Sequence, residues 1–568
     1  MSKLLNPQQQ TLMKTYGTLL AFFLLATIPY QACVFFSGQT SIGQFLTAIG
    51  LSAIWIIPVY FAPVITKPYC AIMGGLFTLL SALKLSYFML YGTAITQSTL
   101  FIAFDSNSHE GSEFIISYLR WWIPLLTLGY IVVMTLLWRK IERPQGVKGE
   151  RPYLIFSLII LLSFSLPIIH KGLKDGGTSA ASFKRFHKRL GFATPFTIPT
   201  SYLAYRQQLS NMEALIDHAD TVPPVKDLVD TEADKAKTVV LVIGESTDRH
   251  RMGLYGYSRN TNPELNKIKG QLDIFNNVYT ARPYTIETLE QVLSFADERH
   301  PNLYMKQPTL IAMMKQAGYK TFWITNQQTL TQRNTMLTFF SQQADEQAYL
   351  NNNDKQNLAS YDEKVLLPFK KALQDTAKKK LIVVHLLGTH RDYKYRYTAP
   401  FDHFQSKQGI TTSVALNKDQ VKTYNQYDNA VLYNDWLLSQ LINDYKTTSP
   451  YGMLVYFSDH GEEVYDYRSY EGRDESNPSE YMYSIPFFVW RSPSWKAAHP
   501  ADWHAYQDRL YSSQHFISTF SDMIGLRFKG QRFDRSLISP HYKPSEVLVG
   551  NPNAPSTLRD IRRQPLPG

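Results

Sequence analysis

The chain of 568 residues is too long for a single hydrophobic core and long enough for two or three domains. It carries 58 Lys and Arg against 47 Asp and Glu, a net charge of +11, which suits nucleic acid, anionic lipid or the cytoplasmic rim of a membrane protein. Because the basic residues concentrate beside apolar stretches and not along the C-terminal part, the composition argues against a nucleic-acid partner.

The first 170 residues contain five long apolar stretches. Each approaches the ~20 residues that a helix needs to cross a hydrocarbon core. Five such stretches in succession favour membrane spans over buried helices of a soluble domain. The first is too long, and followed by too many others, for a cleavable signal peptide. The predicted spans are residues 16–36, 44–64, 69–91, 121–138 and 153–169.

The charges of the loops between these spans predict an orientation. The loop after the fourth span, "RKIERPQGVKGER", carries five basic residues, and the N-terminal segment and the loop after the second span also contain lysine. Residues 37–43 are uncharged, and residues 92–117 hold three acidic and no basic residues. The positive-inside rule therefore places the N-terminus in the cytoplasm and everything after about residue 170 in the periplasm or outside the cell.

Lys84 lies within the third predicted span, about seven residues from its outer end. A charge at that depth is costly, and contact with a polar headgroup is one explanation for it. The other is that the long side chain reaches the outer interface by snorkelling, which is the interpretation that the position favours.

The chain is expected to divide into a membrane domain (residues 1–170), a linker (171–236) and a C-terminal domain (237–568). The linker opens with a basic segment containing Phe, which suits either an anionic membrane surface or a solvated tether, and ends in an acidic stretch with prolines. Cys33 and Cys70, the only cysteines, fall within or beside predicted spans, so the C-terminal domain is expected to fold without disulfides.

From residue 237 onward, short apolar runs alternate with helical patterns. Such alternation predicts a mostly parallel α/β sheet. The predicted strands lie at residues 239–243 and in "YKTFWIT", "KKLIVVHLLGTH", "GMLVYFSDHGEE" and "SIPFFVW", and the predicted helices in "TLIAMMKQAG", "EKVLLPFKKALQD" and "YDNAVLYNDWLLSQLINDY".

Three of these predicted strands end in side chains that can bind a metal. Glu245 ends the first, Asp459 and His460 follow another, and His385 and His390 lie at the end of a third. Because the carboxyl ends of parallel strands share one edge of a sheet, these side chains are expected to lie close together. A mixed set of oxygen and nitrogen ligands suits Zn²⁺, or Mn²⁺ if oxygen dominates.

A nucleophile is also expected near this edge. The stretch "NVYTARPYTIETLEQVLSFA" offers Thr280, Thr285 and Thr288 ahead of a helix. The free N–H groups of a helix N-terminus favour an alkoxide, and coordination to a divalent cation lowers the pKa of the hydroxyl further. An ordinary helix-capping threonine is the simpler interpretation, and the residues alone leave the choice open.

Several motifs carry a resemblance to a known family: "GES", "LYGY", "TNPEL", "FNNVYTARPYTIETL", "TFWITNQQT", "HLLGTHRDYKYRY" and "YFSDHGEEVYD". The chain resembles the membrane phosphoethanolamine transferases of Gram-negative bacteria, and among them the CptA (EptC) subgroup that modifies the lipopolysaccharide core. These belong to the alkaline phosphatase and sulfatase superfamily. The resemblance covers nearly the whole chain and implies five transmembrane helices followed by a periplasmic α/β domain of that superfamily, in the bacterial inner membrane.

The resemblance also implies a mechanism. The family transfers phosphoethanolamine from phosphatidylethanolamine through a covalent phosphothreonine enzyme and leaves diacylglycerol. Carried over motif by motif, Thr285 is the nucleophile, His390 contacts the donor phosphate and Asn326 lies near the ethanolamine-phosphate pocket. One tight Zn²⁺ site is implied, with a second, transient metal possible. The implied zinc ligands are Glu245, Thr285, Asp459 and His460.

Two departures bear on the acceptor. Many relatives carry a second substrate-contacting histidine ten to twenty residues after the Asp-His pair, where this chain has Glu471 or Arg473. Relatives most active on lipid A also have periplasmic disulfides, which this chain lacks. These departures bear on the geometry of the acceptor. The resemblance to the CptA (EptC) subgroup implies the inner core of lipopolysaccharide as the acceptor, with lipid A phosphates or another periplasmic glycan as alternatives.

Other chemistry on the same fold remains open. A metal-dependent phosphodiesterase or a glycerol-phosphate transferase would use a similar site, and a membrane-anchored binding protein would keep the fold without a working metal centre. A sulfatase of the common type needs C/S-x-P-x-R, which does not occur in the chain. The residues say nothing of the oligomeric state.

Overall fold

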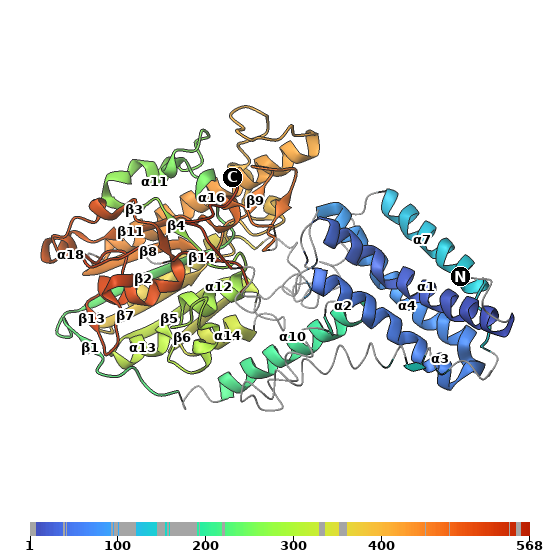
Figure 1. Ribbon diagram of the computed structural model, residues 1–568. Coiled ribbons are helices and arrows are strands. Elements are labelled where there is room, and N and C mark those ends of the chain that lie inside the picture. Colours follow the sequence, from blue (N-terminus) through green and yellow to red (C-terminus); the bar gives the residue numbers. More distant parts are fainter. Residues whose placement is uncertain are drawn as a thin grey trace. The chain divides into compact units, whose positions relative to one another are not determined.

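The computed structural model shows two compact units, Met1–Gln208 and Leu209–Gly568 (Figure 1). We describe each by itself. The structure describes residues 7–568 except 38–39, 41, 92–94, 96–99, 101–120, 145–150, most of 152–189, 192, 218–221, 329–334, 352–359, 449, 476, 545 and 552–557.

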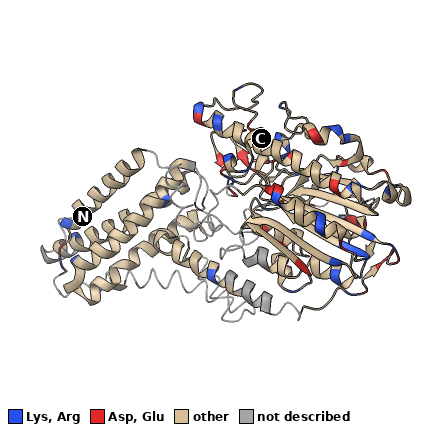
Figure 2. Ribbon diagram, turned by 180° about the vertical axis from the view of Figure 1, so that it is seen from behind, with Lys and Arg blue, Asp and Glu red and all other residues tan. Residues whose placement is uncertain are grey.

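Four helical stretches in the described part of the first unit are long and apolar enough to cross a membrane. They include α1 (Pro7–Phe36), α2 (Ile42–Ala53), α4 (Thr66–Tyr91) and α7 (Trp122–Arg139). Figure 2 shows these helices almost entirely free of charged residues. Helices at the first four predicted spans are thereby confirmed. The span predicted at 153–169 lies largely outside the described residues, so the number five stays a prediction.

Aromatic side chains and one glycine pack α1 against α4. The Phe23 and Phe77 rings lie 6.4 Å apart, and both belong to a buried cluster that also contains Phe22. A Cβ at Gly74 would lie 2.2 Å from the Phe22 ring, so the absence of a side chain lets the two helices approach closely.

Lys84 in α4 is buried, with only 2% of its surface exposed. Its Nζ donates a hydrogen bond to Thr197 Oγ1 (3.0 Å) at the start of α10 (Thr194–Asp217) and lies 4.3 Å from the centre of the Tyr30 ring in α1. Snorkelling, favoured from the sequence, is therefore wrong. A hydroxyl and an aromatic face inside the unit solvate the ammonium group, so the side chain does not extend to the interface.

We expect Lys84→Met to lower the free energy of unfolding of the detergent-solubilised chain by about 1–2 kcal/mol, because it removes a charged hydrogen bond and a cation–π contact. Chemical denaturation checks this, with Lys14→Met as the control because Lys14 is exposed. If Lys84→Met were as stable as wild type but had lost its activity, the result would instead indicate that Lys84 contacts a lipid headgroup.

The second unit is built on a seven-stranded sheet of order β3-β11-β8-β2-β7-β5-β6 (Figure 1). Strands β8, β2, β7, β5 and β6 run parallel, and β11 pairs antiparallel with both β8 and β3. The strands are β2 (Lys237–Gly244), β3 (Leu272–Phe275), β5 (Lys320–Gln328), β6 (Glu346–Asn351), β7 (Lys379–His385), β8 (Gly452–Ser458) and β11 (Phe487–Arg491).

The strands and helices predicted from apolar periodicity are confirmed. The three predicted helices are α13 (Leu310–Gln316), α15 (Leu366–Gln374) and α16 (Lys418–Thr447). Two strands at the edges of the sheet, β3 and β6, went unpredicted. The burial of β6 does not alternate, and half of its sequence, "EQAYLN", is polar, so the strand signal is weak.

Both faces of the sheet are covered. Side chains of α15 and α16, among them Phe369, Leu437 and Leu441, share one buried cluster with Val240 and Ile382 of the central strands. On the other face, Phe516 of α19 (Phe516–Met523) lies 5.0 Å from Phe457 and 6.2 Å from Phe487, ring centre to ring centre. A parallel sheet buried on both faces leaves the carboxyl ends of its strands as the place for a site.

Candidate metal centre and active site

Three adjacent parallel strands bring the predicted metal-binding residues together. Strand β2 lies between β7 and β8, with Ile243 opposite both His385 and Phe457. Glu245 directly follows β2, and Asp459 and His460 directly follow β8. These three strands therefore end at one edge of the sheet, as predicted from the sequence.

A strained turn directs Glu245 toward Asp459. Ser246 has a φ of +58°, a left-handed conformation that is uncommon outside glycine. Its backbone N–H donates to Asp459 Oδ1 (3.1 Å), and its hydroxyl donates to Glu245 Oε1 (2.8 Å). The Asp459 N–H in turn donates to Gly244 O (3.1 Å). These bonds fix two carboxylates on neighbouring loops.

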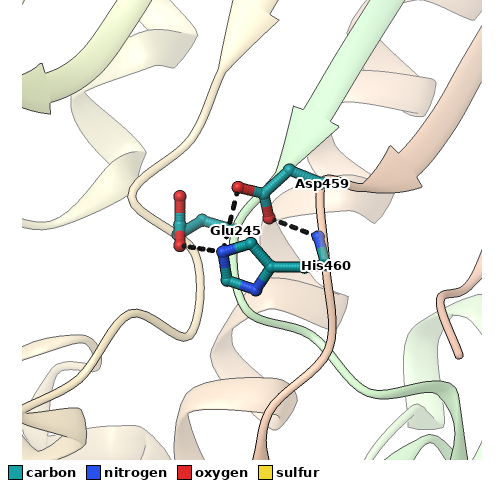
Figure 3. Close-up of side chains that lie close together, drawn as sticks. All are labelled: Glu245, Asp459 and His460. Atoms are coloured by element: carbon teal, nitrogen blue, oxygen red, sulfur yellow. Dashed lines mark hydrogen bonds and ion pairs between the residues drawn. The ribbon is translucent and has the colours of Figure 1, made fainter. Parts of the chain in front are cut away.

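Glu245, Asp459 and His460 offer ligand atoms within 4.8 Å of one another, and all three are buried (Figure 3). His460 Nε2 lies 3.1 Å from Glu245 Oε1 and 3.3 Å from Asp459 Oδ2. The His460 Nδ1 lies 2.9 Å from Gly461 O, a contact that suits an Nδ1–H tautomer and leaves Nε2 with its lone pair.

The charges of the cluster are unbalanced. Burial raises the pKa of Asp459 well above its ordinary value, and the neighbouring Glu245 charge raises it further. Burial opposes ionisation of Glu245 as well, but the charges of His460, His390 and Arg473 hold its pKa well below the usual range. A divalent cation would relieve the repulsion between two buried carboxylates.

Thr285 joins this cluster from the first turn of α12 (Thr285–Val292). Its Oγ1 donates to Glu245 Oε2 (2.9 Å) and lies 3.3 Å from His460 Nε2. The other two candidates bond within their own segment, since the hydroxyls of Thr280 and Thr288 both donate to Arg282 O (3.0 and 2.8 Å). Of the three threonines, the structure brings Thr285 to the carboxylates and the histidine.

Asn326 does not contact this cluster. Its Nδ2 donates to Ser360 O (3.0 Å) and Asp362 Oδ1 (2.8 Å), its Oδ1 accepts from Ser360 Oγ (2.8 Å), and the side chain is fully buried. Gln327, which the sequence did not single out, donates from Nε2 to Glu245 Oε2 (3.3 Å) and to Leu386 O (2.7 Å). Successive side chains of a strand point to opposite faces. Gln327 therefore turns toward Glu245, while Asn326, one residue earlier, turns away from it.

His390 is half-buried in the loop after β7, close enough for its charge to act on Glu245. The same loop approaches the metal-binding residues at Gly388, where a Cβ would lie 2.8 Å from the backbone N and O of Glu245. His385 is fully buried with its ring 6.1 Å from that of Trp323, edge to face. Burial lowers the pKa of His385 to about 4, so its imidazole is neutral.

Of the two residues that the sequence offered in place of a second histidine, Arg473 reaches the site. Its Nη1 contacts His460 Nε2 and lies 3.6 Å from Glu245 Oε1. Glu471 lies in β10 (Glu471–Gly472), which pairs with β9 (Glu463–Val464), and accepts a hydrogen bond from the Tyr465 hydroxyl (3.0 Å).

The residues present fit a zinc ion. Three carboxylate and imidazole groups and one hydroxyl converge, and Asp459 Oδ2 is buried without a hydrogen bond from any residue that the structure describes. A buried carboxylate oxygen in that state calls for a cation. Glu245, Asp459 and His460, with Thr285 beside them, are the residues that would hold it.

Comparison with known proteins identifies the family of the chain. The family model described as Sulfatase matches residues 237–526. The chain is 43% identical to the phosphoethanolamine transferase EptC of Escherichia coli over 559 residues, covering 97% of this chain and 96% of that protein. It is 42% identical to CptA of Salmonella typhimurium over 575 residues, covering 99% and 98%.

Solved structures agree as well. The C-terminal periplasmic domain of EptC from E. coli, in complex with Zn, is 51% identical with a TM-score of 0.58, covering 61% of this chain and 98% of that one. Full-length EptA from Neisseria meningitidis, an integral membrane protein, shares the fold at 18% identity and a TM-score of 0.61, covering 94% and 97%.

The second unit is thus a sulfatase-family α/β enzyme domain, preceded in the same chain by helices long and apolar enough to cross a membrane. The chain belongs to the phosphoethanolamine transferases of the EptC and CptA type.

Proposed function

We propose that this protein transfers phosphoethanolamine from phosphatidylethanolamine to lipopolysaccharide, with the inner core as acceptor and Thr285 as the nucleophile. The observation that carries the proposal is the position of Thr285 Oγ1, 2.9 Å from Glu245 Oε2 and 3.3 Å from His460 Nε2, on the first residue of a helix. A hydroxyl that lies beside groups able to bind a metal, at a helix N-terminus, is in a position that favours its alkoxide form as a nucleophile.

When bound, zinc would supply a positive charge that lowers the pKa of the Thr285 hydroxyl and offsets the phosphate charge. In the first step, Thr285 Oγ1 forms a bond to phosphorus, the bond between phosphorus and the diacylglycerol oxygen breaks, and that oxygen takes up the proton that Thr285 loses. In the second step, an acceptor oxygen displaces Thr285, which regains a proton. His390 is proposed to contact the donor phosphate, and Asn326 to act on the ethanolamine pocket from its buried position.

The proposal is supported by the relatives, which are named phosphoethanolamine transferases EptC and CptA and match almost the whole length of the chain. A Zn complex of one EptC domain supports it as well. Mass analysis of lipopolysaccharide tests it, from cells with the wild-type protein, without the protein, and with Thr285→Ala. We expect a phosphoethanolamine-sized increase on the inner core in the first sample alone. An increase on lipid A or on another glycan would overturn the acceptor, and hydrolysis of the donor without transfer would make the protein a phosphodiesterase.

We also propose that the N-terminus lies in the cytoplasm and the second unit in the periplasm, anchored in the inner membrane. The basic residues in the loop that follows α7 support this orientation. An alkaline phosphatase fused to the C-terminus is expected to be active, and one fused after Arg143 inactive. The reverse pattern would overturn the orientation.

A further inference from the structure

Arg473 places a guanidinium group among the metal-binding side chains. Its Nη1 contacts His460 Nε2, lies 3.3 Å from His460 Nδ1 and lies 3.6 Å from Glu245 Oε1. Only 12% of the side chain is exposed. Arginine keeps its charge in any protein environment, so this group is a permanent cation inside the candidate active site.

We infer that Arg473 binds the phosphate group of the substrate, as the second cation of the site beside the metal. This inference deepens the proposed function and rests on it for the identity of the substrate.

The guanidinium and a metal ion compete for the same atoms. Glu245 and His460 Nε2 are the groups that Arg473 contacts, and they are also groups of the candidate metal site. Two cations cannot share one lone pair, so metal binding displaces the guanidinium from His460 Nε2. Arg473 is therefore not a support that the metal ligands need.

The backbone keeps the displaced side chain close. The residue before Arg473, Gly472, pairs with Glu463 between β10 and β9, and the residue after it, Asp474, donates its N–H to Met482 Sδ (3.3 Å). The guanidinium thus moves by rotation of its side chain while its Cα stays beside the site. Among the described residues, the carboxylate of Glu462 also forms an ion pair with Arg473, 3.9 Å from its Nε. That distance is too long for a hydrogen bond, so Glu462 leaves the N–H donors of the guanidinium to other acceptors.

The charge balance of the loaded site favours an anion at this place. The two charges of a divalent metal would be formally matched by Glu245 and Asp459, so a guanidinium beside them would add to the attraction that the metal exerts on a phosphate. The fork of N–H donors on arginine matches two oxygens of a phosphate and remains fixed while charge develops on them. Arg473 is the group in contact with the triad that has this geometry.

Binding of zinc and of inorganic phosphate to the full-length protein in detergent tests the inference. For Arg473→Gln we expect zinc affinity equal to or higher than that of wild type, because a competing cation is gone. We expect the zinc-loaded variant to bind inorganic phosphate about tenfold more weakly or worse, since a charge-assisted contact is lost. Arg473→Lys, which keeps the charge without the fork, is expected to lie between the two.

Arg468→Gln is the matched control, since Arg468 lies in the same loop but bonds to Glu463 (3.2 Å) and the Asn477 carbonyl, and not to the triad. Phosphate affinity that is unchanged in Arg473→Gln would overturn the inference, as would wild-type protein that binds no phosphate. If Arg473→Gln bound zinc tenfold more weakly while the zinc-loaded variant still bound phosphate as wild type does, Arg473 would be a residue that supports the metal ligands, and the inference would be overturned. Phosphate binding that depends on Arg473 in a protein that does not modify lipopolysaccharide would overturn the proposed function alone.

Discussion

Thr285→Ala is expected to abolish both transfer and the covalent phosphoethanolamine adduct that forms when the wild-type protein meets phosphatidylethanolamine without an acceptor. The adduct requires the oxygen that lies 2.9 Å from Glu245 Oε2. The fold is expected to survive, because one hydrogen bond to a buried carboxylate is worth only ~1–3 kcal/mol. Intact-protein mass spectrometry measures the adduct, and Thr285→Ser should retain part of it.

Thr288→Ala provides the matched control. This threonine lies one turn further along α12, and its hydroxyl donates to the Arg282 carbonyl (2.8 Å). The control variant should form the adduct. Peptide mapping that placed the adduct on Ser246, Thr280 or Thr288 would show that the assignment of the nucleophile is wrong, and transfer without any adduct would replace the two-step mechanism with direct transfer.

Glu245→Ala and His460→Ala are expected to lose the zinc that the purified wild-type protein should contain at about one ion per chain. Each removes a group of the candidate triad. Changing a residue that only supports a metal ligand already costs roughly 10–100-fold in affinity, so removing a ligand should cost more than about 100-fold. Elemental analysis after dialysis measures the zinc content. X-ray absorption spectroscopy should give metal–ligand distances of ~2.0–2.2 Å.

The control for these variants is Glu471→Gln, since Glu471 accepts a hydrogen bond from the Tyr465 hydroxyl and does not reach the triad. It should keep its zinc. A chelator should lower the thermal midpoint of wild type and of Glu471→Gln, because a ligand that binds the folded state stabilises it, and should leave the midpoint of the two ligand variants unchanged. Full zinc content in Glu245→Ala or His460→Ala would contradict the site.

The clustering of the candidate metal ligands was predictable, because the topology of the sheet brings Glu245, Asp459 and His460 together. The apolar runs that end in Glu245 and in Asp459 and His460 predict parallel strands. The carboxyl ends of neighbouring parallel strands lie at the same edge of the sheet. The order of the strands, with β2 between β7 and β8, was not predicted, since alternating strands and helices indicate a parallel sheet but not which strands are neighbours. The edge strand β6 has only Ala348 and Leu350 packed against the core, too short an apolar pattern to be recognised in the sequence.

The direction of a single side chain was harder to predict than its element. Asn326 and Gln327 are adjacent in β5, and only the paired structure decides which one turns toward Glu245. Arg473 follows a short hairpin whose pairing, Gly472 with Glu463, is set by two residues on each strand. For Lys84, the partner Thr197 lies 113 residues away, so no local pattern could reveal it.

The buried bonds of Asn326 change how a loss of activity at that position should be understood. The Asp362 carboxylate that accepts from Asn326 also accepts from the backbone N–H groups of Leu387 (2.9 Å) and Gly388 (2.7 Å). The loop that carries His390 and abuts the backbone of Glu245 is therefore tethered, through one acid, to the end of β5. An Asn326 variant is therefore expected to lower activity by loosening the loop that carries His390, and such a loss would not by itself show that Asn326 contacts a ligand.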